Sequence, residues 1–349
     1  MSAFFHPLSE QLLEKKHLFE KHQIAPDSLE AKKLIEAGYE RIKQTLKAPK
    51  NAVISMMPSL QQALFRVYDH VFENAIKTGK TYILVPQTMP RLLLEKLEKL
   101  EKRGCILHFI KCHKDGTIDL EDLEKHLSYR TSLVTLCLAD PLLGTIQEIK
   151  KIQEKLAPLD ILLHVDVTYA IGKFDIDLKH IEADFVTFSL EAINSPHHAI
   201  VIGKELLEER MFYHDVQFFD TALYAAVHSE CALSCALLRN YFVKQLNMIE
   251  GCSIFSHPPL SLPNCVIASF LGCDQEALLY LLEGLDASIG NGPFQDLKDM
   301  LLNIGHPFAF ARSSLSFQLS EKMTKDSIDN LIEKIKCAVE KLRRASCHL

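Results

Sequence analysis

Asp166 is the residue of this chain whose type and place best suit chemistry. It lies near the end of the strand-like segment 160–167, which reads DILLHVDV. A carboxylate at the carboxyl end of a buried parallel strand points into the crevice where open α/β sheets bind ligands. A second interpretation stays open, in which Asp166 only caps the turn that follows the strand.

Ser59 is a second candidate, because a hydroxyl at the start of a helix can serve two purposes. The spacing of Ser59 and Gln62 matches the S-x-x-Q capping box. The free N–H groups of a helix that directly follows a strand also bind anions. The sequence therefore predicts helix capping by Ser59 and leaves an anion site open.

Histidines and cysteines raise the question of a metal site. His197 and His198 are adjacent, while His228, Cys231 and Cys235 fall on one face of an expected helix. Zinc sites usually use recognisable spaced ligand pairs, and neither set contains one. The expected helix is apolar on nearly every side, so we interpret these residues as core packing and predict no metal site.

The ten cysteines are scattered, and no C-x-x-C pair occurs. In a chain without an export signal this pattern indicates buried thiols in a reducing compartment. The first residues, MSAFFHPLSEQLLEKKH, lack the basic start and apolar core of a signal peptide. No apolar run approaches the ~18–20 residues that a membrane helix needs. We therefore expect a cytoplasmic protein with no membrane partner.

Charge and composition exclude other classes of protein. The chain has 349 residues, with 39 basic and 45 acidic side chains and a net charge of −6. Nucleic-acid-binding proteins usually carry a clustered basic surplus, so no nucleic-acid partner is expected. The hydrophobic share of 48% is that of a globular protein and excludes a disordered chain. No P-loop, G-x-G-x-x-G or G-x-S-x-G motif is present.

Strand-like and helix-like segments alternate through the first two thirds of the chain. Strands are predicted at 51–55, 81–85, 105–111, 132–139, 160–167, 183–189 and 198–203. Helices are predicted at 28–47, from Ser59, and at 90–103, 119–128 and 145–156. Continuous apolar strands between helices indicate an α/β fold with a mostly parallel sheet covered on both faces. The last three strands lack long helices between them, which predicts a mixed sheet there.

From about residue 245 the pattern changes to α+β. Strands are predicted at 263–270 and 313–319, and helices at 274–284, 294–303 and 325–344. About 100 residues of this kind suit a second, smaller domain. We predict a large α/β domain over residues 15–244 and a small α+β domain formed by residues 1–14 and 245–349.

The segment HVDVTYAIGKFDIDLKHIEADFVTFS carries a known pattern. It resembles the cysteine desulfurase group of the class V aminotransferase family, which reads close to HVDATQ(S/A)VGK-x-x-IDL…DF-x-(S/T)FSGHK. GTIDLEDLEKHL and LGTIQEI precede it in the same order. The resemblance runs from about residue 28 to the C-terminus and is weaker in the second domain. It implies the fold-type-I architecture of pyridoxal-phosphate-dependent transferases, with a seven-stranded sheet.

Part of the family's cofactor site is retained. The resemblance implies that Asp166 pairs with the pyridinium nitrogen, which makes the cofactor ring an electron sink. It also places Ser59 and Ser189 at phosphate-binding positions. Tyr169 stands where the family has a glutamine that bonds the ring oxygen, and Met57 stands where it has a glycine.

The residues that perform the family's reaction are replaced. The Schiff-base lysine position is Ala192, and no lysine occurs between Lys179 and Lys204. The position of the persulfide-forming cysteine is Pro293, and that of the carboxylate-clamping arginine is Ser316. A methyl group, a proline ring and a hydroxyl cannot supply an amine, a thiolate or a bidentate guanidinium.

Further positions around the same cleft depart from the family. The histidine that stacks on the ring falls at Pro90, and the Asn-Asn-Glu turn falls at 140–142 as Asp-Pro-Leu. The Gly-His pair before the lysine is Leu-Glu at 190–191. Arg312 is near Ser316, but four residues along a strand span roughly 13 Å.

These replacements predict a catalytically inactive relative that acts by binding, with a role in sulfur transfer and a protein partner there. Homodimerisation follows from the resemblance. We expect no pyridoxal phosphate, or noncovalent binding through the retained residues. The alternative hypothesis is a divergent pyridoxal-phosphate-binding enzyme, a cysteine desulfurase or other transferase or lyase, that uses residues such as Glu191, His197 or His198. A metal- or ligand-binding module in the old cleft is a third.

Overall fold

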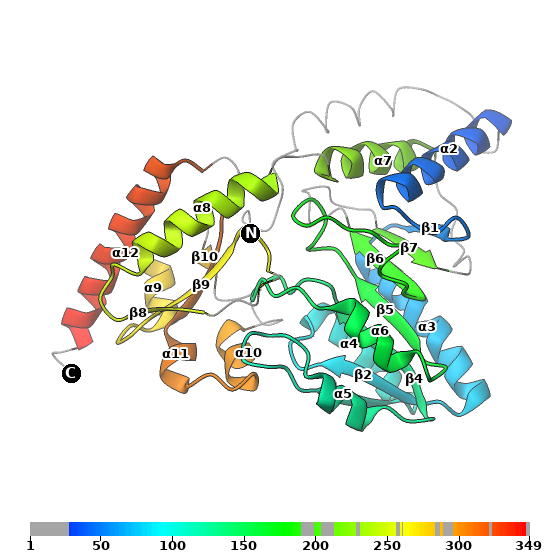
Figure 1. Cartoon of the computed structure of the whole chain (residues 1–349), viewed down its shortest axis with the longest axis horizontal. Helices are drawn as coiled ribbons and strands as arrows, with labels where there is room; N and C mark the ends of the chain where they lie inside the picture. The colour runs from blue at the N-terminus through cyan, green and yellow to red at the C-terminus, as the bar shows by residue number, and fades with distance from the viewer. Residues whose placement is uncertain are drawn as a thin grey trace.

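The large sheet lies in the right half of Figure 1 and has seven strands in the order β1-β7-β6-β5-β4-β2-β3. The computed structural model describes residues 28–189, 199–203, 213–227, 231–255, 259, 261–282, 287–288, 296–320 and 323–346. The strands of the large sheet are β1 (Val53–Met57), β2 (Tyr82–Pro86), β3 (Ile106–Ile110), β4 (Thr131–Cys137), β5 (Leu162–Asp166), β6 (Phe185–Ser189) and β7 (Ala199–Gly203).

The sheet is parallel except at β7, which runs antiparallel to both of its neighbours, β6 and β1. The contacts of β5 with β4 and β6 are parallel, as are those of β2 with β3 and β4. The prediction of a mixed sheet at its last strands is therefore confirmed. The carboxyl ends of β4, β5 and β6 meet at one edge, which is where Asp166 lies.

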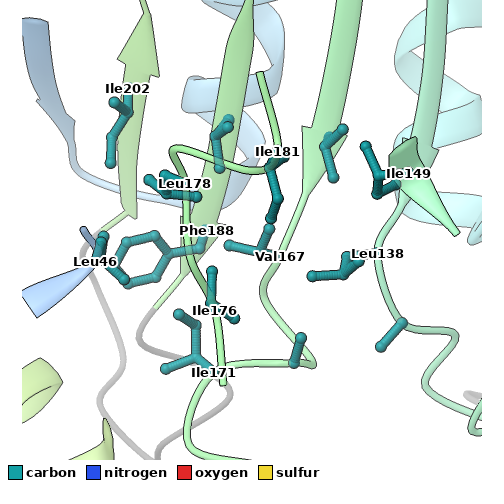
Figure 2. Packing of buried hydrophobic residues seen from close by; sticks show 14 of the residues in the cluster. Leu46, Leu138, Ile149, Val167, Ile171, Ile176, Leu178, Ile181, Phe188 and Ile202 are labelled. Atoms are coloured by element: carbon teal, nitrogen blue, oxygen red, sulfur yellow. The ribbon is translucent and has the colours of Figure 1, made fainter. Parts of the chain in front are cut away.

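Helices cover both faces of this sheet, as the continuous apolar strands predict. On one face α3 (Leu60–Thr78) and α4 (Arg91–Glu101) bury one apolar cluster. On the other face a second cluster gathers side chains of α2 (Leu29–Thr45), α5 (Leu120–His126), α6 (Ile149–Leu156) and α7 (Tyr213–Val227). Figure 2 shows part of this second cluster, with Phe188 of β6 and Ile202 of β7 beside Leu178.

The small sheet lies in the left half of Figure 1, with the order β10-β11-β9-β8 and antiparallel pairing throughout. Its strands are β8 (Cys252–Ile254), β9 (Cys265–Phe270), β10 (Ala287–Ser288) and β11 (Ser314–Gln318). The helices of this half are α8 (Cys231–Leu246), α9 (Gln275–Leu281), α10 (Leu297–Asn303), α11 (Phe308–Arg312) and α12 (Lys325–Ser346). α8, α9 and α12 share an apolar core with this sheet.

Most predicted elements lie within a few residues of the observed ones, but one helix prediction was wrong in extent. The helix predicted at 145–156 begins only at Ile149. Ile146 pairs with Ala139 in a β-bridge, and the Gln147 side chain donates to the Gly116 carbonyl, so this segment is held extended. Of the helix expected around His228, the described parts are α7 up to Val227 and α8 from Cys231, and residues 228–230 lie outside the described residues.

The predicted domain boundary between residues 244 and 245 stays a prediction. Phe242 and Leu246 of α8 are fully buried in the core of the small sheet. We propose that the boundary lies earlier, between α7 and α8. No helix among the described residues combines the length and the hydropathy that crossing a membrane requires.

Candidate functional site

Asp166 ends β5 and is almost fully buried, with 1% of its surface exposed. Its Oδ2 atom accepts hydrogen bonds from the hydroxyls of Thr187 (2.6 Å) and Thr168 (3.1 Å). Its Oδ1 atom accepts from the Thr168 backbone N–H at 3.1 Å. The carboxylate is therefore held in one orientation, and the turn-capping interpretation is confirmed as part of what Asp166 does.

A buried chain of polar side chains continues from Asp166 across the sheet. The Thr187 oxygen lies 3.0 Å from His164 Nε2, and His164 Nδ1 lies 2.7 Å from Thr135 Oγ1. The Tyr68 hydroxyl, on α3, lies 3.2 Å from the same Thr135 oxygen. Each of these side chains is at most 1% exposed.

The roles of donor and acceptor along this series of side chains follow from the carboxylate at one end, which can only accept. Because Thr187 donates to Asp166, its oxygen accepts from His164 Nε2–H, which leaves Nδ1 to accept from Thr135. Tyr68 then donates to the Thr135 oxygen. Burial lowers the pKa of His164 to about 3, so the ring is neutral near pH 7.

Ser189, at the end of β6, belongs to the same hydrogen-bonded group as Asp166. Its backbone N–H donates to the Thr168 hydroxyl at 3.1 Å, so Thr168 links the two candidate residues. Sequence reasoning missed Thr168, Thr187 and His164. The signal available was the alternation in HVD and VTFS, which places polar residues on one face of β5 and β6 within apolar strands.

Ser59 is the N-cap of α3, and its side chain accepts from the Gln62 backbone N–H at 3.3 Å. The capping prediction is confirmed, while the anion site stays a prediction. Met57, at the end of β1, is fully buried and belongs to the apolar cluster under α3. The side chain at the position of the family's glycine is therefore part of the apolar core in this chain.

Tyr169 and Pro90 both take structural places. Tyr169 is half-buried and packs against the apolar cluster on the α2 and α6 side of the sheet. Pro90 is buried at the first turn of α4, where it makes no side-chain cap. Proline suits this position because its fixed φ matches the start of a helix.

Ser316 is fully buried and turned onto the chain itself. Its hydroxyl donates to the Leu142 carbonyl at 2.9 Å. Nearby, Gln318 Nε2 donates to the Pro141 carbonyl at 3.1 Å, and Cys265 Sγ lies 3.3 Å from the Leu142 oxygen. The positions of the family's arginine and of its Asn-Asn-Glu turn are thus joined to each other.

Arg312 does not replace the missing arginine. It ends α11 and pairs with Asp274 at 3.2 Å, with 57% of its side chain exposed. The guanidinium is therefore bound at the surface of the small domain, away from the buried Ser316.

Burial makes several of the described thiols poor nucleophiles. Burial raises the pKa of Cys112 and of Cys265 to about 11. Burial, followed by the Asp166 and Asp140 carboxylates, raises the pKa of Cys137. A thiol reacts readily when its pKa is lowered and solvent can reach it. Cys337 is exposed, and it lies on α12 of the small domain.

Several predicted positions lie outside the described residues: Ala192, Pro293, Glu191, His197, His198 and His228. The side chain of Cys231 is not described either. Among the residues that the structure does describe, no group of three His, Cys, Asp or Glu side chains could hold a metal ion.

The fold and the buried aspartate define a pyridoxal-phosphate-type transferase scaffold, and comparison with known proteins identifies the family. The model of the class V aminotransferase family matches residues 19–218, more than half of the chain. This chain therefore belongs to the class V aminotransferase family. Its architecture is that of the fold-type-I proteins, with a mostly parallel seven-stranded sheet.

The similar curated proteins are cysteine desulfurases. The chain is 25% identical to "Cysteine desulfurase IscS" of Clostridium botulinum, over 90% of this chain and 86% of the relative. It is 26% identical to "Cysteine desulfurase IscS 1" of Archaeoglobus fulgidus, over 90% and 88%. It is cysteine desulfurase-like, as the sequence resemblance predicts.

Solved structures show the same fold. A structure titled "NIFS-LIKE PROTEIN" matches with a TM-score of 0.85 and 22% identity, over 95% of this chain and 96% of that chain. A NifS-like protein from Rickettsia africae matches with a TM-score of 0.81 and 19% identity, over 96% and 97%.

Two positions of this chain bear on whether it could hold pyridoxal phosphate, the cofactor on which its family depends. Asp166 could face a ring nitrogen, and its orientation is fixed by three hydrogen bonds. At the position that the resemblance aligns with the family's Schiff-base lysine, this chain has Ala192, and a methyl group has no amine to bond the cofactor's aldehyde.

Proposed function

We propose that this protein is a catalytically inactive member of the cysteine desulfurase group that acts by binding. The observation that carries the proposal is the hydrogen bond from Ser316 to the Leu142 carbonyl, at 2.9 Å in a fully buried environment. Because the Ser316 hydroxyl donates its hydrogen to the chain's own backbone, it has no hydrogen left to donate to a substrate carboxylate.

The other two replacements support the same proposal. Ala192 has no amine to bond an aldehyde or to move a proton, and Pro293 has no thiol to accept sulfur. Loss of one member of a catalytic unit usually costs several orders of magnitude in rate. Three such losses leave a scaffold whose intact features are its fold and its buried core.

We infer that the binding role belongs to sulfur transfer in the cytoplasm, with a desulfurase or another protein of that process as the partner. A homodimer is the expected state. Both inferences rest on the family and on the relatives' names. Neither needs a catalytic cleft, because a partner surface can persist after the reaction is lost.

Pyridoxal phosphate titration tests the proposal at position 192. The unaltered protein is titrated, reduced with borohydride and mapped by peptide mass spectrometry. We expect scattered surface-lysine adducts at substoichiometric levels. One equivalent of cofactor on a single lysine would contradict the proposal, because a lysine from elsewhere in the chain would then have replaced Ala192.

The variant Ala192→Lys is the matched positive control for this titration. It restores the amine at the family's position, and we expect one reducible adduct at residue 192. Ala157→Lys is the control for a new lysine placed elsewhere, because Ala157 is exposed at the end of α6. This variant should give no more adduct than the unaltered protein.

The buried Asp166 favours a second candidate function. A carboxylate fixed by Thr187 and Thr168 is suited to a protonated ring nitrogen, so a divergent enzyme could hold pyridoxal phosphate noncovalently. Saturable binding without any reducible adduct, abolished in Asp166→Ala, would support this candidate over the first.

A further inference from the structure

Residues 140–146, which follow β4 of the large domain, form a strap that is bonded to the small domain. The carbonyls of Pro141 and Leu142 accept from Gln318 and Ser316 of β11. The Gly144 carbonyl accepts from the Leu262 N–H at 2.7 Å, next to a β-bridge between Thr145 and Ser261. The strap is therefore fastened to the small domain along its length.

Apolar contacts reinforce these hydrogen bonds. Leu142 and Leu143 are both fully buried, and they pack with Phe255, Ile267 and Leu301 of the small domain in one apolar cluster. Movement of the two domains relative to each other has to disturb this strap.

Asp140 begins the strap and fixes its turn. Its Oδ1 atom accepts from the backbone N–H groups of Leu142 at 2.9 Å and Leu143 at 2.7 Å. The residue is 5% exposed, and no cationic side chain of the described residues forms an ion pair with it. A buried carboxylate without a cation is costly when it is ionised.

The groups that face Asp140 from the packed elements are thiols. The negative charge of Asp140 raises the pKa of Cys112 after β3, of Cys137 of β4 and of Cys265 of β9. Further away, Asp166 also raises the pKa of Cys137, and Arg239 lowers the pKa of Cys265. Burial raises the pKa of all three thiols, so they stay neutral over the range where a carboxyl titrates.

We propose that residues 140–146 form a pH-sensitive latch between the two domains, closed when Asp140 is neutral and loosened when Asp140 is ionised. Burial raises the pKa of Asp140 to about 6, against the two backbone hydrogen bonds that lower it. A raised folded-state pKa means that the stabilisation is complete at low pH and is lost as the pH rises through about 6. The proposal does not depend on the proposed function.

Comparison with Asp119 shows that burial, and not the geometry of the turn, raises the pKa of Asp140. Its Oδ1 atom also accepts from two backbone N–H groups, those of Glu121 at 2.9 Å and Asp122 at 3.1 Å. It is partly exposed, and those hydrogen bonds lower its pKa. The same arrangement thus titrates in opposite directions at the surface and in the strap.

Hydrogen exchange of the Leu142, Leu143 and Leu262 amides tests the latch. After correction for intrinsic rates, we expect their opening equilibrium constant to rise about tenfold between pH 5 and pH 8. Asp140→Asn keeps an acceptor oxygen and removes the charge, so its opening should be independent of pH over this range. Asp119→Asn is the matched control and should behave as the unaltered protein.

Two outcomes would overturn the proposal. One is a pH dependence in Asp140→Asn equal to that of the unaltered protein. The other comes from carbon-13 NMR of the unaltered protein, which titrates the Asp140 carboxyl directly and does not require the variant to fold. An apparent pKa near 4 there would leave the strap without its titrating group.

Discussion

At the scale of single residues, the site keeps a buried aspartate, while the proposal places alanine, proline and serine at the family's reacting positions. Asp166 is held by Thr187 and Thr168, and behind them stands a neutral histidine. Hydrogen bonds in a low-dielectric interior are costly to leave unmade, so this polar chain stabilises the fold only while every member is paired. Such a chain can be kept for stability alone after catalysis is lost.

The buried His164 predicts acid sensitivity. Its folded-state pKa of about 3 lies below the ordinary 6.5, so stability is complete above pH 6.5 and is lost as the pH falls toward 3. Between pH 7 and pH 4 the contribution amounts to about 3 kcal/mol. Because Asp140 titrates in the opposite sense over this range, the loss is measured by chemical denaturation as the difference in free energy of unfolding between the unaltered protein and a His164 variant.

The variant His164→Gln should remove this part of the pH dependence, while lowering stability at pH 7 through lost packing. His180→Gln, at a histidine whose side chain is 84% exposed, is the matched control and should keep the full slope. An unchanged slope in His164→Gln would show that another group is responsible.

At the scale of elements, the sequence allowed the strands and helices to be predicted with fair bounds, because apolar runs and capping residues are local signals. Ser59 and Asp166 were found in this way. The segment before Ile149 was not, because its extended form depends on Gln147 reaching Gly116, about 30 residues away. The bond between Ser316 and Leu142 was equally out of reach, since it joins residues 174 positions apart.

Two serine N-caps allow the anion site at α3 to be separated from capping. Ser28 caps α2 by accepting from the Ala31 N–H at 3.1 Å, much as Ser59 caps α3. Ser28→Ala and Ser59→Ala should each lower the free energy of unfolding by about 1 kcal/mol. Thermal denaturation with and without inorganic phosphate then compares the two.

If the start of α3 is an anion site, phosphate should raise the melting temperature of the unaltered protein and of Ser28→Ala but not of Ser59→Ala. Equal responses of all three proteins would reduce Ser59 to a helix cap.

At the scale of the whole molecule, the strap of residues 140–146 joins the part of the chain with the large sheet to the part with the small sheet. Ser316, Gln318 and Cys265 of the small sheet converge on its carbonyls. The family membership and the fold are shared with cysteine desulfurases, yet fold alone does not carry activity. The proposed binding role therefore uses the shared architecture, while Ser316 bonds to the chain's own Leu142 carbonyl.

Turnover of cysteine shows whether this protein is catalytically inactive. The full-length protein is incubated with cysteine, pyridoxal phosphate and a reductant, and alanine and sulfide are quantified beside the Clostridium botulinum IscS relative as positive control. The account predicts no alanine above the level of a protein-free reaction, and none with Ala192→Lys alone, because Pro293 and Ser316 still lack the required groups. Alanine and sulfide released in equal amounts by the unaltered protein would contradict it.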